Sequence, residues 1–300
     1  MISRRKSLLG RWAERACQGT LGTSTRRRKR SRMHVSRTES LEIRVLLSGT
    51  NPDPVTGRIV NGEETSAFES VGMVNYGCSG TLISPTHVLT AAHCTVGVND
   101  TGGTFQVNGQ TYRTSRIVNH PDYRPNQIGS DSANDISIMV LDRPVQGVTP
   151  YQINRAAPSV GQLLTLVGFG GGGTGNSGHT GDFGTKRVGT TPIDGVSSTL
   201  ITWNFDNNNE SNTAPGDSGG PAFVEVNGTF LIAGVTSGGD RADAGIGDHS
   251  FDTRVDAYAS WIDSVVGTPT PDPGPNPQPP ADDHVNDPGP NATAITLTNG

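Results

Sequence analysis

The stretch PAFVEVNGTFLIAGVTS at residues 221–237 decides the fold class. It holds two apolar runs, PAFVEV and FLIAGVTS, on either side of the pair Asn227-Gly228. β-Branched and aromatic residues favour strands, and an Asn-Gly pair allows the positive φ angles of a tight hairpin turn. The stretch therefore predicts two antiparallel strands joined by a short turn.

Similar short apolar runs occur through residues 59–266, among them GTLIS, HVLTAA, DISIMVL and LLTLVGFG. Clusters of Gly, Asn, Asp and Pro separate them, and a second hairpin signal lies at Asn108-Gly109. This pattern predicts an antiparallel sandwich or barrel. The one predicted helix covers 255–266, where five apolar residues share a face: Val255, Tyr258, Trp261, Ile262 and Val265.

The charge distribution divides the 300 residues into a basic N-terminal part and an acidic remainder. Residues 1–50 carry 13 Lys+Arg against 3 Asp+Glu, whereas the rest of the chain is acidic. The basic part lacks the aromatic residues of a nucleic-acid module, so we interpret it as a leader and expect no nucleic-acid partner. No stretch approaches the ~18 consecutive apolar residues of a transmembrane helix. The predicted organisation is a basic leader at 1–58, a core domain at 59–266, a Pro-rich linker at 267–290 and the start of an incomplete module at 291–300.

Three polar residues stand beside apolar or glycine-rich segments: His93 in TAAHC, Asp135 in ANDISIMVL and Ser218 in PGDSGGP. A serine hydroxyl becomes a nucleophile when a base of near-neutral pKa takes its proton, and histidine is suited to that task. A carboxylate is needed to orient the histidine. Glycines let a turn present backbone N–H groups to an oxyanion, and Gly216 and Ser218 are the candidate donors.

These three motifs, in this order, resemble those of the trypsin/chymotrypsin-like serine endopeptidases, from Ile59 to about Val266. The resemblance implies an all-β fold with two six-stranded antiparallel β-barrels of the chymotrypsin type and a C-terminal helix. It also implies that His93 is the general base and then acid, that Asp135 orients it and that Ser218 is the nucleophile. The expected substrate is a protein or peptide, cleaved through an acyl-enzyme with no metal or organic cofactor.

Two further features match the same family. CSGTLISPTHVLTAAHC resembles the segment whose cysteines form a disulfide beside the catalytic histidine, which implies a Cys78–Cys94 bond and suits a secreted or envelope-bound protein. RIVNG resembles an activation site, where a second protease would cleave between Arg58 and Ile59 and the new ammonium would pair with Asp217. A free cysteine pair and an unprocessed first strand are the structural alternatives.

The resemblance also suggests a substrate-binding pocket. Its candidate residues are Asn212, Thr213, Ser237, Gly238 and Gly239. Trypsins carry an aspartate where this chain has Asn212, so the charge pair that selects basic side chains is absent there. Asp252, in FDTRV, is a second candidate for the pocket floor, where it would restore a negative charge. The cysteines that brace this pocket are missing, and Ala214 stands at one of their positions.

Other functions fit less well. GDSGG also satisfies the G-x-S-x-G pattern of α/β-hydrolases, but a polar segment precedes Ser218 where that fold needs a buried strand. The segment 168–173 satisfies GxGxxG without a following helix, which indicates a loop. A catalytically weak or inactive protease-like binding module of a cell-surface protein stays open as an alternative. SLEIRVLLSG at 40–49 supports a surface setting, since it resembles the LEPR-XLL motif.

Overall fold

The computed structural model describes residues 59–125 and 133–267. The predicted leader, linker and incomplete module therefore lie outside the described residues, apart from Gly267. Sixteen strands are present in the described part. The first seven are β1 (Glu63–Glu64), β2 (Val71–Val74), β3 (Cys78–Ser84), β4 (His87–Thr90), β5 (Thr104–Val107), β6 (Gln110–Asn119) and β7 (Ser137–Leu141). The others are β8 (Leu163–Gly168), β9 (Gly173–Thr174), β10 (Gly178–His179), β11 (Arg187–Pro192), β12 (Gly195–Val196), β13 (Leu200–Phe205), β14 (Pro221–Val226), β15 (Thr229–Gly239) and β16 (Asp248–Arg254).

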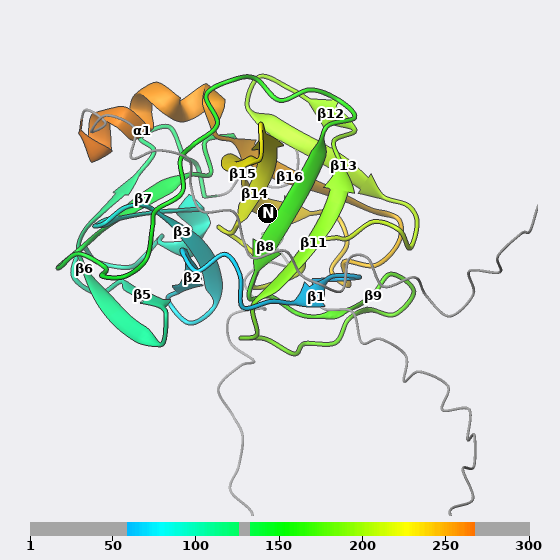
Figure 1. Cartoon of the computed structure of the whole chain (residues 1–300), viewed down its shortest axis with the longest axis horizontal. Helices are drawn as coiled ribbons and strands as arrows, with labels where there is room; N and C mark the ends of the chain where they lie inside the picture. Colours follow the sequence, from blue (N-terminus) through cyan, green and yellow to red (C-terminus); the bar gives the residue numbers. More distant parts are fainter. Residues whose placement is uncertain (1–58, 126–132, 268–300) are drawn as a thin grey trace, which may run out of the picture. The chain divides into compact units, whose positions relative to one another are not determined.

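Strands β2 to β7 close into a six-stranded antiparallel barrel in the order β2-β3-β4-β7-β6-β5 (Figure 1). Its interior is apolar because alternate strand residues point inward. Leu82, Val88, Phe105 and Ile138 are among its fully buried side chains. A Cβ on Gly72 would lie 2.4 Å from the carbonyl oxygen of Gln106, so β2 and β5 approach closely where the barrel closes.

A second antiparallel sheet contains the later strands, in the order β1-β11-β8-β14-β15-β16-β13-β12. Its six inner strands form the second half of the protein, and the two-residue strands β1 and β12 extend its edges (Figure 1). Trp203, Leu164 and Val224 fill its core. The predicted all-β fold of the chymotrypsin type is confirmed.

Both predicted hairpin turns are present. Asn108 and Gly109 connect β5 to β6 with φ angles of 48° and 70°, and Asn227 and Gly228 connect β14 to β15 with 53° and 77°. These are left-handed conformations, which asparagine and glycine adopt more readily than other residues.

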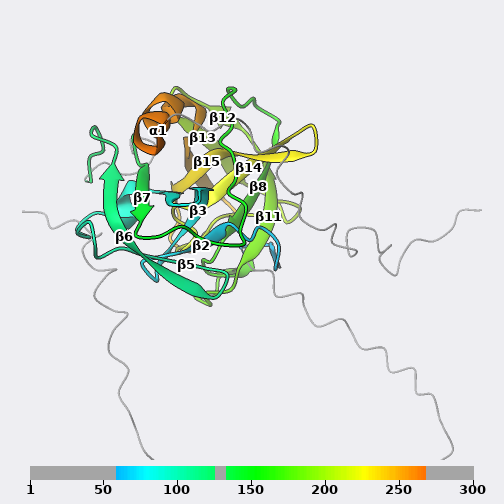
Figure 2. The same cartoon turned by 60° about the vertical axis from the view of Figure 1, so that its left-hand side comes forward.

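The C-terminal helix is also present. A 3₁₀ turn (Asp256–Tyr258) leads into α1 (Ala259–Val266). The Trp261 ring meets His120 edge-on at 5.2 Å between centroids. Figure 2 shows α1 beside β7, so the last helix of the described residues lies against the first barrel. No helix among the described residues is long and apolar enough to cross a membrane.

Candidate active site

His93 and Asp135 come together although they lie in different segments. His93 belongs to a 3₁₀ turn (Ala92–Cys94) that follows β4, and Asp135 lies just before β7. Antiparallel pairing of β4 with β7 brings these two segments together. The Nδ1 atom of His93 lies 2.7 Å from Oδ2 of Asp135, and the backbone N–H of His93 donates to Oδ1 at 2.9 Å. Two contacts from one residue fix the carboxylate against the ring.

Further donors surround Asp135. The Ser237 hydroxyl donates to Oδ2 at 2.6 Å, and the Thr253 hydroxyl donates to the Asp135 carbonyl at 3.0 Å. Burial opposes ionisation of Asp135, but hydrogen bonds from His93 and Ser237, together with the charge of His93, lower the pKa of this carboxyl below its ordinary value. Because the Asp135 carboxylate is a hydrogen-bond acceptor next to Nδ1, neutral His93 carries its proton on Nδ1. The Nε2 atom is then free to accept a proton.

Ser218 lies in a turn that packs against the first barrel. The Ser79 N–H donates to the Ser218 carbonyl at 2.8 Å, and the Cys94 Sγ lies 3.5 Å from the same oxygen. Gly219 follows with a φ of 81°, and a Cβ there would lie 2.1 Å from the Thr90 hydroxyl oxygen. Only glycine fits at that position. The turn therefore holds Ser218 beside the segment that carries His93.

The Gly216 carbonyl is held by Ser79, whose hydroxyl donates to it at 3.0 Å. The same hydroxyl oxygen accepts the Phe169 N–H at 3.0 Å. Gly216 has a φ of 98°, a conformation that L side chains rarely adopt. Within residues 59–125 and 133–267, the N–H groups of Gly216 and Ser218 donate to no acceptor. Both amides are thus available to an oxyanion. Ser79 was not among the residues expected at the site, because its role depends on contacts between distant segments.

The Asp217 side chain is buried in the interior. Its Oδ1 accepts the Gly170 N–H at 2.7 Å, and its Oδ2 accepts the Ala214 N–H at 2.9 Å. Burial raises the pKa of Asp217 to about 6, although these hydrogen bonds and the charge of Arg187 oppose the rise. Arg187 is itself fully buried and donates to the Gly170 carbonyl at 2.7 Å.

The glycine-rich segment 168–173, predicted as a loop, leads from β8 into β9 and encloses the Asp217 carboxylate. A Cβ on Gly168 would lie 2.2 Å from Asp217 Oδ1, and one on Gly170 would lie 2.5 Å from its Cγ. No local pattern marks this role of the two glycines. It becomes visible only once β8 and the Ser218 turn are placed together.

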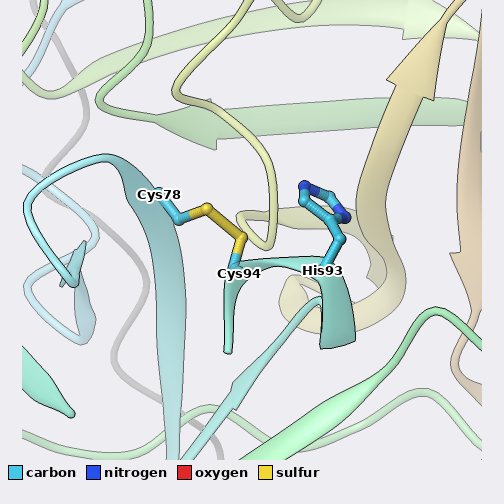
Figure 3. Close-up of side chains that lie close together, drawn as sticks. All are labelled: Cys78, His93 and Cys94. Carbon is cyan, nitrogen blue, oxygen red and sulfur yellow. A yellow bond between two sulfur atoms is a disulfide. The ribbon is translucent and has the colours of Figure 1, made fainter. Parts of the chain in front are cut away.

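Cys78 and Cys94 form a disulfide with an S–S distance of 2.02 Å. Figure 3 shows the sulfur atoms and the His93 ring close together on one side of the Ala92–Cys94 turn. Two cysteines and a histidine within 4.8 Å are compatible in composition with a metal site. The sulfurs are bonded to each other, however, and are not thiolates that could bind a metal ion.

The candidate pocket residues lie around a buried polar network. Asn212 and Thr213 are buried before the Ser218 turn, and Ser237, Gly238 and Gly239 form the end of β15. The Asn212 amide donates to Oδ2 of Asp248 at 2.8 Å. Asp252 is also fully buried, two residues beyond Ser250 on β16. The sequence suggested Asp252 as a pocket residue. It did not suggest Asp248, because Asp248 lies in the segment 240–250, which could not be aligned with the family.

Known proteins with similar sequences include a trypsin of Simulium vittatum, 34% identical over 109 residues that cover 30% of this chain and 42% of the relative. Glandular kallikrein-10 of Rattus norvegicus is 32% identical over 137 residues, 39% of this chain and 53% of the relative. A trypsin of Saccharopolyspora erythraea is 29% identical over 204 residues, 60% of this chain and 83% of the relative. The alignments span about half the length of the first two relatives. The Trypsin family model matches residues 59–262, and the chain therefore belongs to the trypsin family.

Proposed function

We propose that this protein is a serine endopeptidase in which Ser218 is the nucleophile, His93 the base and Asp135 the orienting carboxylate. The observation that carries the proposal is the 2.7 Å contact between His93 Nδ1 and Asp135 Oδ2, made beside the turn that holds Ser218. Membership of the trypsin family supports the same reaction. A base with its proton fixed on Nδ1 has Nε2 free for the serine proton.

The reaction follows from these positions. The Ser218 hydroxyl attacks the carbonyl carbon of the scissile bond as His93 Nε2 takes its proton. The oxyanion that forms accepts hydrogen bonds from the Gly216 and Ser218 amides, which have no other acceptor in the described part of the chain. Protonated His93 then gives the proton to the leaving amine, and water hydrolyses the acyl-enzyme by the reverse sequence of proton transfers.

Substrate binding is assigned to two segments next to His93, Asp135 and Ser218: the end of β15 and the residues just before the Ser218 turn. Ser237 contacts Asp135, and Gly238 and Gly239 continue β15 with no side chain to obstruct a peptide. Asn212 and Thr213 lie on the segment before the nucleophile turn. The substrate is a protein or peptide, and the disulfide suits a secreted or envelope-bound enzyme.

We also propose that cleavage after Arg58 activates the enzyme. Arg58 lies outside the described residues, but Ile59 is fully buried and has a φ of 47°, which strains a β-branched residue. Val60 is anchored by exchanging backbone hydrogen bonds with Asn212, 3.0 Å each. Cleavage would remove the φ constraint on Ile59 and supply an ammonium group. Asp217, buried beside the nucleophile, is the acid that this group would meet.

A serine-directed fluorophosphonate tests the nucleophile. The full chain, cleaved after Arg58, should be labelled at Ser218, and Ser218→Ala should lose both the label and nearly all peptide hydrolysis. Ser115→Ala, which changes an exposed hydroxyl on β6, is the matched control and should keep both. Full labelling of folded Ser218→Ala would contradict the assignment. A folded wild-type chain with neither label nor hydrolysis would favour the inactive binding module.

A further inference from the structure

The proposed catalytic carboxylate lies just before β7 of the first barrel, but the later part of the chain holds it. The Ser237 hydroxyl, at the end of β15, contacts the Asp135 side chain, and the Thr253 hydroxyl, on β16, contacts its backbone carbonyl. A third contact comes from Tyr258, in the 3₁₀ turn that follows β16 and precedes α1. It reaches Asn134, the residue just before Asp135.

The Tyr258 hydroxyl forms two hydrogen bonds with Asn134. It accepts the Asn134 backbone N–H at 3.1 Å and donates to Asn134 Oδ1 at 3.0 Å. The Asn134 amide nitrogen points the other way and donates to the Asp122 carbonyl at 3.4 Å. Burial raises the pKa of Tyr258, although the Asn134 N–H opposes the rise. The hydroxyl therefore keeps, at neutral pH, the proton that it donates.

Asn134 has a backbone conformation that needs support. Its φ is 67°, in the left-handed region that asparagine adopts more readily than other residues with a side chain. The Ile136 N–H donates to the Asn134 carbonyl at 2.8 Å, which closes a tight turn centred on Asp135. In so short a turn, rotation of the backbone at Asn134 redirects the Asp135 side chain.

Packing fixes the position of the Tyr258 hydroxyl. The Tyr258 ring is buried and meets the His120 ring edge-on, with 5.1 Å between the centroids. The His120 N–H donates to the Ile136 carbonyl at 3.0 Å, so the same segment pairs with the chain just after Asp135. The Tyr258 N–H donates to the Val255 carbonyl at 3.0 Å. Ring and backbone are thus both held, and the hydroxyl is a fixed anchor for Asn134.

We propose that Tyr258 is a positioning residue of the active site: it holds Asn134 in its left-handed conformation and thereby keeps the Asp135 carboxylate aligned with His93. The inference rests on the proposed function, because it needs Asp135 to orient the general base. Alignment of reacting groups tolerates little error. Loss of the Tyr258 hydroxyl should therefore lower the fraction of molecules in which His93 is correctly oriented, with little effect on substrate binding.

Tyr258→Phe removes the hydroxyl and keeps the ring. In the full chain cleaved after Arg58, it should lower kcat for a fluorogenic peptide by about 10-fold, because two polar groups of Asn134 lose their partner. KM should stay within about 2-fold, since the interaction serves the reaction and not binding. Tyr76→Phe, which changes an exposed ring, is the matched control and should leave both constants unchanged. A folded Tyr258→Phe enzyme with kcat within about 2-fold of wild type would overturn the proposal.

A double-mutant cycle separates positioning from a purely structural role. With Asp135→Asn already present, Tyr258→Phe should lower kcat by less than about 2-fold, because the carboxylate that the hydroxyl positions is gone. A hydroxyl that only stabilises the fold would cause the same loss in both backgrounds. Equal losses of about 10-fold would therefore overturn the proposal.

Variants of Asn134 give a second test that leaves Tyr258 intact. Glycine adopts a φ of 67° without strain, whereas alanine does not. Asn134→Gly should keep kcat within about 3-fold of wild type, and Asn134→Ala should lower it by about 10-fold. Equal losses in the two variants would overturn the proposal. Absence of fluorophosphonate labelling in folded wild type would instead contradict the proposed function.

Discussion

Replacing Asp135 by asparagine tests how the carboxylate orients His93. Both carboxylate oxygens of Asp135 accept hydrogen bonds. Oδ1 accepts the backbone N–H of His93, and Oδ2 accepts the His93 Nδ1–H and the Ser237 hydroxyl. An asparagine must turn its NH₂ group toward one of these sides. The change keeps the size of the side chain, so its effect comes from hydrogen bonding and charge.

The two orientations of the amide differ in free energy. With its oxygen at the Oδ2 position, the NH₂ group faces the His93 N–H, and that partly buried donor loses its acceptor, which costs about 1–3 kcal/mol. With its oxygen at the Oδ1 position, the NH₂ group donates to His93 Nδ1, and the Ser237 hydroxyl can rotate to accept. The second orientation is therefore favoured by about 5- to 150-fold, and it moves the His93 proton to Nε2.

Histidine with its proton on Nε2 cannot accept the proton of Ser218. Loss of the negative charge also weakens stabilisation of the imidazolium, by about another 10-fold. The two effects together predict that Asp135→Asn lowers kcat by about 50- to 1,500-fold, within the loss of up to about 10⁴ that this substitution causes in serine proteases with the same triad.

The assay is hydrolysis of a fluorogenic peptide at neutral pH, with circular dichroism to confirm the fold. Asp142→Asn removes an exposed acid that pairs with Arg143 and should change kcat by less than about 2-fold. An Asp135→Asn enzyme within about 10-fold of wild type would refute the reasoning, because His93 would then be oriented by other groups.

Three other predictions concern the disulfide, activation and pH. Replacing Cys78 and Cys94 by alanine should lower the free energy of unfolding by about 3 kcal/mol in denaturant melts, and an unchanged midpoint would contradict this. Arg58→Gln should give an uncleaved, nearly inactive chain when the activator is trypsin-like, as peptide assays would show; full activity would exclude the switch. In that uncleaved chain the pKa of Asp217 lies at about 6 instead of 3.8, so the folded state holds its proton more tightly than the unfolded state and the fold should lose about 3 kcal/mol of stability as pH rises from about 4 to above 6. Melts in which cleaved and uncleaved chains share one pH dependence would contradict the last prediction.

Local signals in the sequence predicted the fold well. The hairpin at Asn227-Gly228 could be placed because its turn conformation depends on two neighbouring residues. The C-terminal helix could be placed because its apolar face repeats every three to four residues. The second sheet carries two extra edge strands, β1 and β12, that no local signal marked, because each is two residues long and forms only through its partner.

The site was predictable only where a motif marks it. His93, Asp135 and Ser218 lie in characteristic segments, so family resemblance selected them as the catalytic candidates. Asp248 has no such motif, and its place beside the candidate pocket residues depends on a contact with Asn212, 36 residues away. Ser79 is similar, since a serine in a strand has no sequence signature for contacting the nucleophile turn.

The nucleophile turn is held from both halves of the protein. Ser79, on β3 of the first barrel, binds the Ser218 carbonyl through its N–H and the Gly216 carbonyl through its hydroxyl. From the second half, the Gly171 N–H donates to the Pro215 carbonyl at 3.0 Å, and the Gly220 N–H donates to the Asp217 carbonyl at 2.8 Å. Four successive carbonyls, from 215 to 218, are therefore fixed.

Fixing a carbonyl also fixes the plane of its peptide group, and so the direction of the N–H that follows it. The Pro215 and Asp217 carbonyls share planes with the two proposed oxyanion donors, the N–H groups of Gly216 and Ser218. Ser79 fixes the peptide planes of the Gly216 and Ser218 carbonyls, which alternate along the chain with the planes of the Pro215 and Asp217 carbonyls. These fixed planes limit rotation of the peptide groups between them. The direction of each donor thus depends on contacts to both halves of the protein. A change in the packing of β3 should therefore alter catalysis without touching any catalytic residue.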